Sequence, residues 1–282
     1  MDRFLVILMI VFTFGCKPDS DLPITLELHN NWKFKQVGDS LWHPATVPGE
    51  VHSDLFNNKL IEDPFIGNNE FDLQWISETD WEYKTSFRLD DKTLQKKHIE
   101  LNFEGLDTYA SAFLNDSLIL KSNNAFRQFR VDVTTLLKKE NILKIVFEKT
   151  STYEEQEKAK IAYTLPEGNR IFSRKAQFQY GWDWGPKMNT SGIWRAVTLN
   201  AWNDLRIDDI YLNNLSLKDS LANFYIDLDF NKPISDLNYL LIINDTIEQY
   251  PKSVNEYRTV LPVRIRNPKR WWPHNLGEPY LY

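Results

Sequence analysis

The chain has 282 residues, of which 42% are hydrophobic and 26% charged, and this length allows two domains that each bury a core. A formal net charge of −6 argues against a nucleic-acid partner, which needs a basic face. The five histidines lack metal-ligand spacing, and a single cysteine excludes an intrachain disulfide. Neither a glycine-rich phosphate loop nor a GxSxG nucleophile motif occurs, so the sequence predicts no metal and no cofactor.

The N-terminal residues predict an export signal. Arg3 precedes the apolar segment 4–14, which is short for a membrane span, and Gly15-Cys16 follows at once. Cys16 resembles the lipidated cysteine of a bacterial lipoprotein cleavage box; the alternative is an ordinary signal peptide with an incidental cysteine. We therefore expect a lipoprotein-type signal peptide over residues 1–16 and a tether over 17–22. The protein would then be exported and held at the periplasm or outer membrane by a lipid anchor.

Alternation of apolar and polar residues dominates the remainder and predicts half-buried strands in segments 99–104, 224–230 and 261–265. Two apolar runs, 142–147 and 240–243, suit strands buried on both faces. Helical patterns are few. A capping-box pattern at Ser151 opens a charged stretch to Ala162, and residues 51–60 suit one or two turns.

This organisation predicts an all-β fold with a boundary near residues 202–205. Residues 23–203 have the size of a jelly-roll β-sandwich. Residues 204–282 suit an immunoglobulin-like β-sandwich. That domain type typically needs about 100 residues, so we expect the second sandwich to be incomplete.

Three segments are hard to explain as generic sandwich. The first begins with Trp42-His43-Pro44 and continues through Asp63-Pro64-Phe65 to Trp81-Glu82-Tyr83. The second is Phe103-Glu104-Gly105-Leu106-Asp107-Thr108-Tyr109. The third is Tyr180-Gly181-Trp182-Asp183-Trp184-Gly185-Pro186, followed by Ser191-Gly192-Ile193-Trp194-Arg195. Together with residues 268–282, they resemble the two N-terminal domains of glycoside hydrolase family 2, and the third segment resembles its β-mannosidase branch.

The resemblance implies a jelly roll, an immunoglobulin-like domain and a catalytic (β/α)₈ barrel that carries both catalytic glutamates. We expect that barrel, an intramolecular partner, to be missing here, so no catalytic residue is assigned and the chain alone should be inactive. Two Asn-Glu pairs, Asn69-Glu70 and Asn255-Glu256, superficially match the pair that contains the family's acid/base. Both lie in predicted β-domain segments, and we reject both as catalytic acids.

The implied function is that of a retaining exo-β-mannosidase, which acts on terminal β-mannosyl residues of oligosaccharides, with the front domain closing the −1 sugar subsite. Asp183 is the first candidate for sugar contact; the alternative is a structural salt bridge with Arg174 or Arg195. Of Trp182 and Trp184, one is expected to face the sugar and the other to pack under the loop. Arg174 would orient Asp183 or contact substrate. Asn69 and Glu70 match a loop near the same pocket, although Gly67-Asn68 before them departs from the family's pattern.

Two other functions stay open at this stage. The first is a non-catalytic carbohydrate-binding lipoprotein, a role that the aromatic content of 14% also suits because flat rings stack on sugars. The second is another activity of the same family: β-galactosidase, β-glucuronidase or exo-β-glucosaminidase. The Trp182-Asp183-Trp184 run favours β-mannosidase over these.

Overall fold

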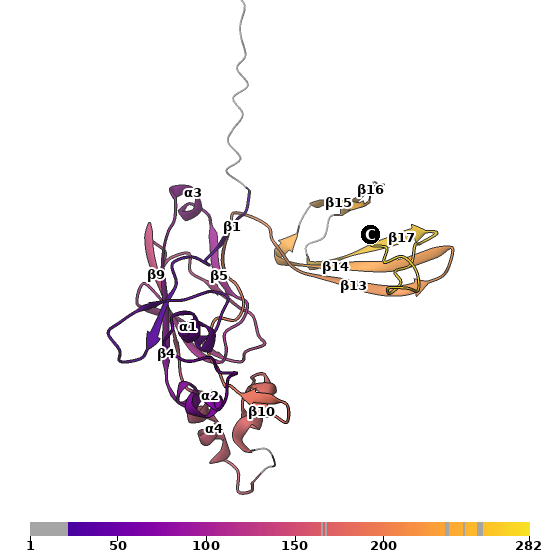
Figure 1. Ribbon diagram of the computed structural model, residues 1–282. Helices are drawn as coiled ribbons and strands as arrows, with labels where there is room; N and C mark the ends of the chain where they lie inside the picture. Colours follow the sequence, from indigo (N-terminus) through magenta and orange to yellow (C-terminus); the bar gives the residue numbers. More distant parts are fainter. Residues whose placement is uncertain (1–21, 165, 167, 235–236, 245, 253–255) are drawn as a thin grey trace, which may run out of the picture. The chain divides into compact units, whose positions relative to one another are not determined.

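The computed structural model describes residues 22–164, 166, 168–234, 237–244, 246–252 and 256–282. They form two compact units (Figure 1). The boundary between the units falls between Asn203 and Asp204 in the sequence. Cys16 and the predicted signal peptide lie outside the described residues, so the lipid anchor stays a prediction. Among the described helices, none has the length and apolar character of a membrane span.

Two antiparallel sheets build the first unit. One has six strands in the order β3-β2-β4-β9-β6-β7, and the other has four in the order β1-β12-β5-β8. Their strands are β1 (Ile24–Glu27), β2 (Lys33–Gln36), β3 (His43–Pro44), β4 (Trp81–Arg88), β5 (His98–Phe103), β6 (Tyr109–Leu114), β7 (Ser117–Asn123), β8 (Phe129–Asp132), β9 (Glu140–Phe147) and β12 (Val197–Trp202). A separate hairpin is formed by β10 (Tyr180–Trp182) and β11 (Gly185–Lys187).

Short helices connect these strands. They are α1 (Val51–Asn57), α2 (Asn69–Asp72), α3 (Asp91–Leu94), α4 (Thr150–Lys158) and the 3₁₀ turns η1 (Gln74–Glu78), η2 (Gly168–Phe172) and η3 (Gln177–Gln179). α1 and α4 occupy the two predicted helical segments. The capping box predicted at Ser151 is wrong, because Lys149 precedes the helix as its N-cap. The Ser151 hydroxyl instead donates to Glu78, 2.8 Å away.

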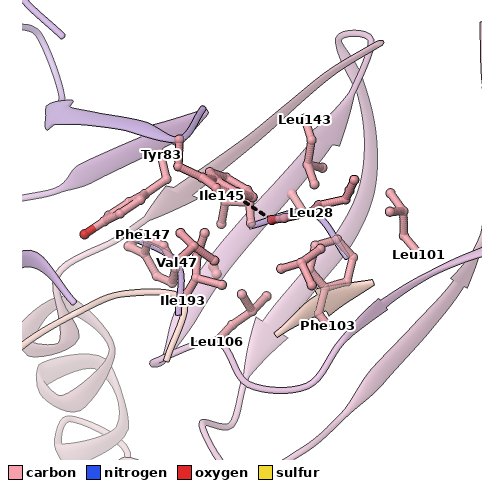
Figure 2. Packing of buried hydrophobic residues seen from close by; sticks show 14 of the residues in the cluster. Leu28, Val47, Tyr83, Leu101, Phe103, Leu106, Leu143, Ile145, Phe147 and Ile193 are labelled. Atoms are coloured by element: carbon pink, nitrogen blue, oxygen red, sulfur yellow. Dashed lines mark hydrogen bonds between the residues drawn. The ribbon is translucent and has the colours of Figure 1, made fainter. Parts of the chain in front are cut away.

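The core of the first unit lies between its two sheets. The alternating residues Ile99, Leu101 and Phe103 of β5 are fully buried, and they pack in one cluster with residues of β9. Figure 2 shows Phe103 in this cluster with Ile145 and Phe147. Because each strand turns alternate side chains inward, the apolar half of the pattern forms the core and the polar half lies on the opposite, partly exposed face of the sheet. The all-β prediction is confirmed.

One expectation about these strands is wrong. The run 142–147 was expected to be buried on both faces, but Ile142 is 56% exposed and burial alternates along β9. Leu240 and Ile242 in the second run are also more than half exposed. The physical reason is that an antiparallel sheet with one face on the core tolerates apolar side chains on its solvent face.

In the second unit, one sheet has the order β13-β14-β17, with β13 (Ile207–Leu217), β14 (Leu221–Ile234) and β17 (Glu256–Arg266). A further hairpin joins β15 (Leu237–Ile243) and β16 (Thr246–Lys252). The apolar cluster in this unit is small and centres on Leu228, Phe230, Ile234 and Leu261. Across the sheet, the Arg258 guanidinium donates to Asp227, 2.8 Å away.

Candidate functional site

The hairpin of β10 and β11 carries the most specific part of the sequence. Tyr180 lies opposite Lys187 and Trp182 opposite Gly185, so Asp183 and Trp184 form a two-residue turn. Gly181 has a φ of +93°, a left-handed conformation that favours glycine. In the described part of the chain, neither large sheet pairs with this hairpin. The hairpin is therefore part of neither sheet of the sandwich.

The side chains at the tip are exposed. The rings of Trp182 and Trp184 meet edge to face with centroids 5.7 Å apart, and Trp184 is 84% exposed. Asp183 is exposed and makes no hydrogen bond or ion pair with any described residue. The alternative role of Asp183 in a salt bridge is therefore not observed among the described residues: Arg195 lies over the Trp194 ring at 4.3 Å, and the Arg174 side chain has no partner within them.

A hollow of about 1140 Å³ lies beside the hairpin, lined mainly by apolar surface. Its aromatic lining consists of Phe56, Phe65, Phe126, Phe178, Trp182, Trp184 and Trp194. Both predicted tryptophans belong to it, whereas Asp183, Arg174, Asn69 and Glu70 do not. Aromatic rings of this kind offer flat apolar faces, and the Asp183 carboxylate beside them accepts hydrogen bonds from hydroxyl groups. This combination suits a polyhydroxylated ligand.

Buried polar residues also line the hollow. Asp107 accepts hydrogen bonds from Lys175 at 2.7 Å and from Gln179 at 2.8 Å, and all three side chains are buried. Thr190 donates its backbone N–H to Gln179, 3.1 Å away. Burial lowers the pKa of Lys175, while Asp107 opposes this by stabilising the ammonium. No local sequence pattern marks these residues for a role, although Asp107 lies in one of the segments that carry the resemblance.

His52, on α1, also lines the hollow and is buried. Burial lowers its pKa to about 4, and the positive charge of Lys175 contributes in the same direction. Its Nδ1 atom has no hydrogen-bond partner among the described residues. The ring is therefore neutral at pH 7 and is not a second cation beside Lys175.

Glu70 reaches the hairpin, whereas Asn69 does not. The Glu70 carboxylate accepts the backbone N–H of Lys187 at 2.6 Å, and Gln74 donates to the Lys187 carbonyl oxygen at 2.8 Å. Asn69 instead donates to the carbonyl oxygen of Asp63, 2.7 Å away. Both residues lie on α2, and Glu70, which does not line the hollow, binds strand β11 of the hairpin.

A third contact joins the hairpin to α4. The buried carboxylate of Glu154 accepts hydrogen bonds from the hydroxyl of Tyr180 and from that of Ser173, the latter at 2.7 Å. Burial, together with Glu154, raises the pKa of Tyr180 far above its ordinary value, so its hydroxyl stays a donor at all physiological pH values. The hairpin is thus held by residues from α2, α4 and the loop after β5.

No group of three or more His, Cys, Asp or Glu side chains that could hold a metal occurs in the described ranges. The carboxylate deepest in the lining, Asp107, is paired with an ammonium group and is not free to act on a ligand. The arrangement therefore has the means to bind and orient a ligand, through the aromatic rings and through the nearby Asp183 carboxylate, which has no partner among the described residues.

Comparison with known proteins places the first unit in a family. Residues 32–195 match the family model described as glycosyl hydrolase 2 galactose-binding domain-like. A bovine protein named β-mannosidase is 32% identical over 92% of this chain, and a β-mannosidase B of Aspergillus niger is 33% identical over 90%. In both cases the chain spans only 32% of the relative's length.

Comparison with solved structures also finds a protein named β-D-mannosidase. The β-D-mannosidase of Dictyoglomus thermophilum superposes on 90% of this chain with a TM-score of 0.83 and 36% identity, and the match covers 33% of that protein. An exo-chitosanase of Amycolatopsis orientalis superposes with a TM-score of 0.65 at only 16% identity. At that identity, the likeness shows the fold alone.

Proposed function

Because this chain belongs to glycoside hydrolase family 2, we propose that it is the N-terminal part of a retaining exo-β-mannosidase and that its first unit closes one side of the sugar subsite. The relatives named β-mannosidase, at 32–33% identity over at least 90% of this chain, support mannose as the substrate sugar. The chain spans about a third of their length. The proposal therefore assigns the hydrolytic step to residues that this chain does not contain.

The observation that carries the proposal is Asp183, which has no partner among the described residues and lies at the tip of a hairpin between two exposed tryptophans. A carboxylate accepts several hydrogen bonds at once, and two adjacent hydroxyl groups of a terminal sugar supply suitable donors. The Trp182 and Trp184 rings then limit the position of the sugar through contact with its apolar face. Such contacts at the non-reducing end suit an enzyme that removes one terminal residue at a time.

In the retaining mechanism, one carboxylate attacks the anomeric carbon while a carboxylic acid protonates the leaving oxygen, with the two groups about 5–5.5 Å apart. The hairpin has no part in these proton transfers. Its contribution is to hold the sugar so that the anomeric carbon meets the attacking group, which lowers the entropic part of the barrier.

Titration calorimetry of the purified chain with β-mannobiose tests this proposal, with cellobiose as the control sugar. We expect weak binding of β-mannobiose, with a Kd of about 1 mM, and weaker binding of cellobiose. Asp183→Asn should weaken mannobiose binding about tenfold, because charge-assisted hydrogen bonds are lost. Equal affinity in the variant would contradict the role of Asp183.

An assay with an aryl β-mannoside addresses the catalytic step separately. We expect no turnover by the chain alone. Turnover that survives purification to homogeneity would show that the catalytic carboxylates lie within these 282 residues and would overturn that part of the proposal.

A further inference from the structure

The segment 175–190 carries the hairpin, and the Asp107 side chain binds two residues that precede the hairpin. The Lys175 ammonium, at the start of the segment, donates to one Asp107 oxygen. Gln179, just before β10, donates to the other oxygen. The same two residues also bind the far end of the segment. The carbonyl oxygen of Thr190 accepts a hydrogen bond from Lys175, and the N–H of Thr190 donates to the side chain of Gln179.

The backbone of Asp107 extends this attachment. Its N–H donates to the carbonyl oxygen of Gly192 at 2.9 Å, and the N–H of Gly192 donates back at 3.0 Å. A Cβ atom at Gly192 would lie 2.5 Å from the Gly49 carbonyl oxygen, so only glycine allows this close approach. Asp107 therefore binds the segment through its side chain and fixes the residue just beyond it through its backbone.

Burial makes these bonds hard to replace. The side chains of Lys175 and Asp107 are 0% and 8% exposed, so water cannot take over the bonds when they break. Removing one member of a buried ion pair leaves the other charge without compensation, which is far more costly than losing a surface pair. The other hydrogen bonds to the hairpin described above, from Glu70, Gln74 and Glu154, each reach only one of its strands.

We propose that Asp107 is the positioning residue of the site: it fixes segment 175–190 and so sets the direction in which the hairpin presents Asp183. The link to sugar binding rests on the proposed function of Asp183. The positional claim itself rests on the contacts above. Asp107 acts through Lys175 and Gln179 and needs no contact with the sugar.

Amide hydrogen exchange on the whole chain tests the proposal through Asp107→Asn. The asparagine side chain has one oxygen that accepts and one NH₂ group that donates. The NH₂ group would therefore face either the Lys175 ammonium or the Gln179 NH₂ group, so one of the two hydrogen bonds is replaced by a contact between two donors. We expect peptides from residues 176–190 to exchange at least tenfold faster, while peptides from β4 and β9 change less than twofold. Asp54→Asn is the matched control, since it makes the same change at a buried carboxylate that binds Thr46 and Tyr83 instead. It should leave residues 176–190 unchanged.

A second variant decides the question if Asp107→Asn does not fold. Gln179→Met keeps the Lys175–Asp107 pair intact and removes only the hydrogen bonds of the amide, so it leaves no buried charge alone. We expect several-fold faster exchange over residues 180–190. Unchanged exchange in this segment, or an equal increase throughout the first unit, would overturn the proposal, because a purely structural residue affects all strands together.

Affinity for β-mannobiose separates this inference from the proposed function. If both stand, Asp107→Asn loosens the segment and weakens binding by at least threefold. If the wild-type chain binds no β-mannobiose, the proposed function fails while the exchange result still decides the role of Asp107. If exchange increases and affinity does not change, Asp107 fixes the segment without setting the position of Asp183, and the proposal is wrong.

Discussion

The sandwich and the hairpin attached to it are held by different kinds of interaction. In the sandwich, fully buried apolar residues such as Leu101, Phe103 and Ile145 pack between two sheets. In the hairpin segment, three buried or partly buried carboxylates, Asp107, Glu154 and Glu70, accept hydrogen bonds from its side chains and backbone. Apolar packing is strong but has little directional preference, whereas hydrogen bonds fix orientation. The difference indicates that stability resides in the sandwich and orientation in the attachments of the hairpin.

The largest expected effect concerns two isoleucines of the same strand. Ile145→Ala removes a fully buried side chain of β9, so we expect the free energy of unfolding to fall by about 2–5 kcal/mol. Ile142→Ala, at the exposed face of β9, should cost less than about 1 kcal/mol. Urea unfolding followed by tryptophan fluorescence measures both. Similar losses for the two variants would show that the apolar core is not where the sandwich gains its stability.

The second effect is a pH dependence from His52. Its pKa in the folded chain is about 4, below the 6.5 of the unfolded chain, so folding favours the neutral ring. That contribution is fully present above pH 6.5 and is lost as the pH falls to about 4. The loss is about 3 kcal/mol, since each pKa unit corresponds to about 1.4 kcal/mol.

A comparison of the wild type with His52→Gln isolates this contribution. Burial raises the pKa of Asp54 to about 6, so protonation of Asp54 stabilises the fold over part of the same range. Because Asp54 is present in both proteins, it cancels in their difference. Urea unfolding at pH 7.0, 5.5 and 4.5 should show the wild type losing stability relative to the variant at each step. A difference that does not vary with pH would mean that His52 is not held neutral beside Lys175.

The smallest effect on stability is expected at the tip of the hairpin. Trp184→Ala should change the free energy of unfolding by less than about 0.5 kcal/mol, because the ring is largely exposed. It should nevertheless weaken β-mannobiose binding. Trp81→Ala is the matched control, since that ring is buried in the core and its loss should cost about 3–5 kcal/mol. A large loss of stability in Trp184→Ala would contradict the division between scaffold and site.

The sequence predicted the sandwich better than its attachments. Alternation along residues 99–103 identified a strand whose inner face is the core, because a period of two is a local property of the chain. The run 142–147 is apolar except at Lys144, so for it the pattern could not distinguish one buried face from two. The capping box at Ser151 failed because the helix begins earlier and Glu78, distant in sequence, binds that hydroxyl.

The candidate site was predictable only where the residues are adjacent in the chain. Trp182, Asp183 and Trp184 form one motif, and the structure places them together at a turn. The Asp107–Lys175 pair joins positions 68 residues apart, and nothing local marks either residue as a partner of the other. Arg174, which was expected near Asp183, is adjacent to Lys175 in the sequence. The Lys175 side chain is nevertheless buried, whereas Arg174 is exposed.

The hairpin's separate two-stranded sheet has a consequence for how this protein can vary. Since the attachments lie outside the turn, residues 183–184 can be exchanged or extended without altering a ladder hydrogen bond of the sandwich. New turn sequences can thus arise, or be introduced by design, while the sandwich stays unchanged. Substitutions in this turn therefore need no compensating substitutions in the core.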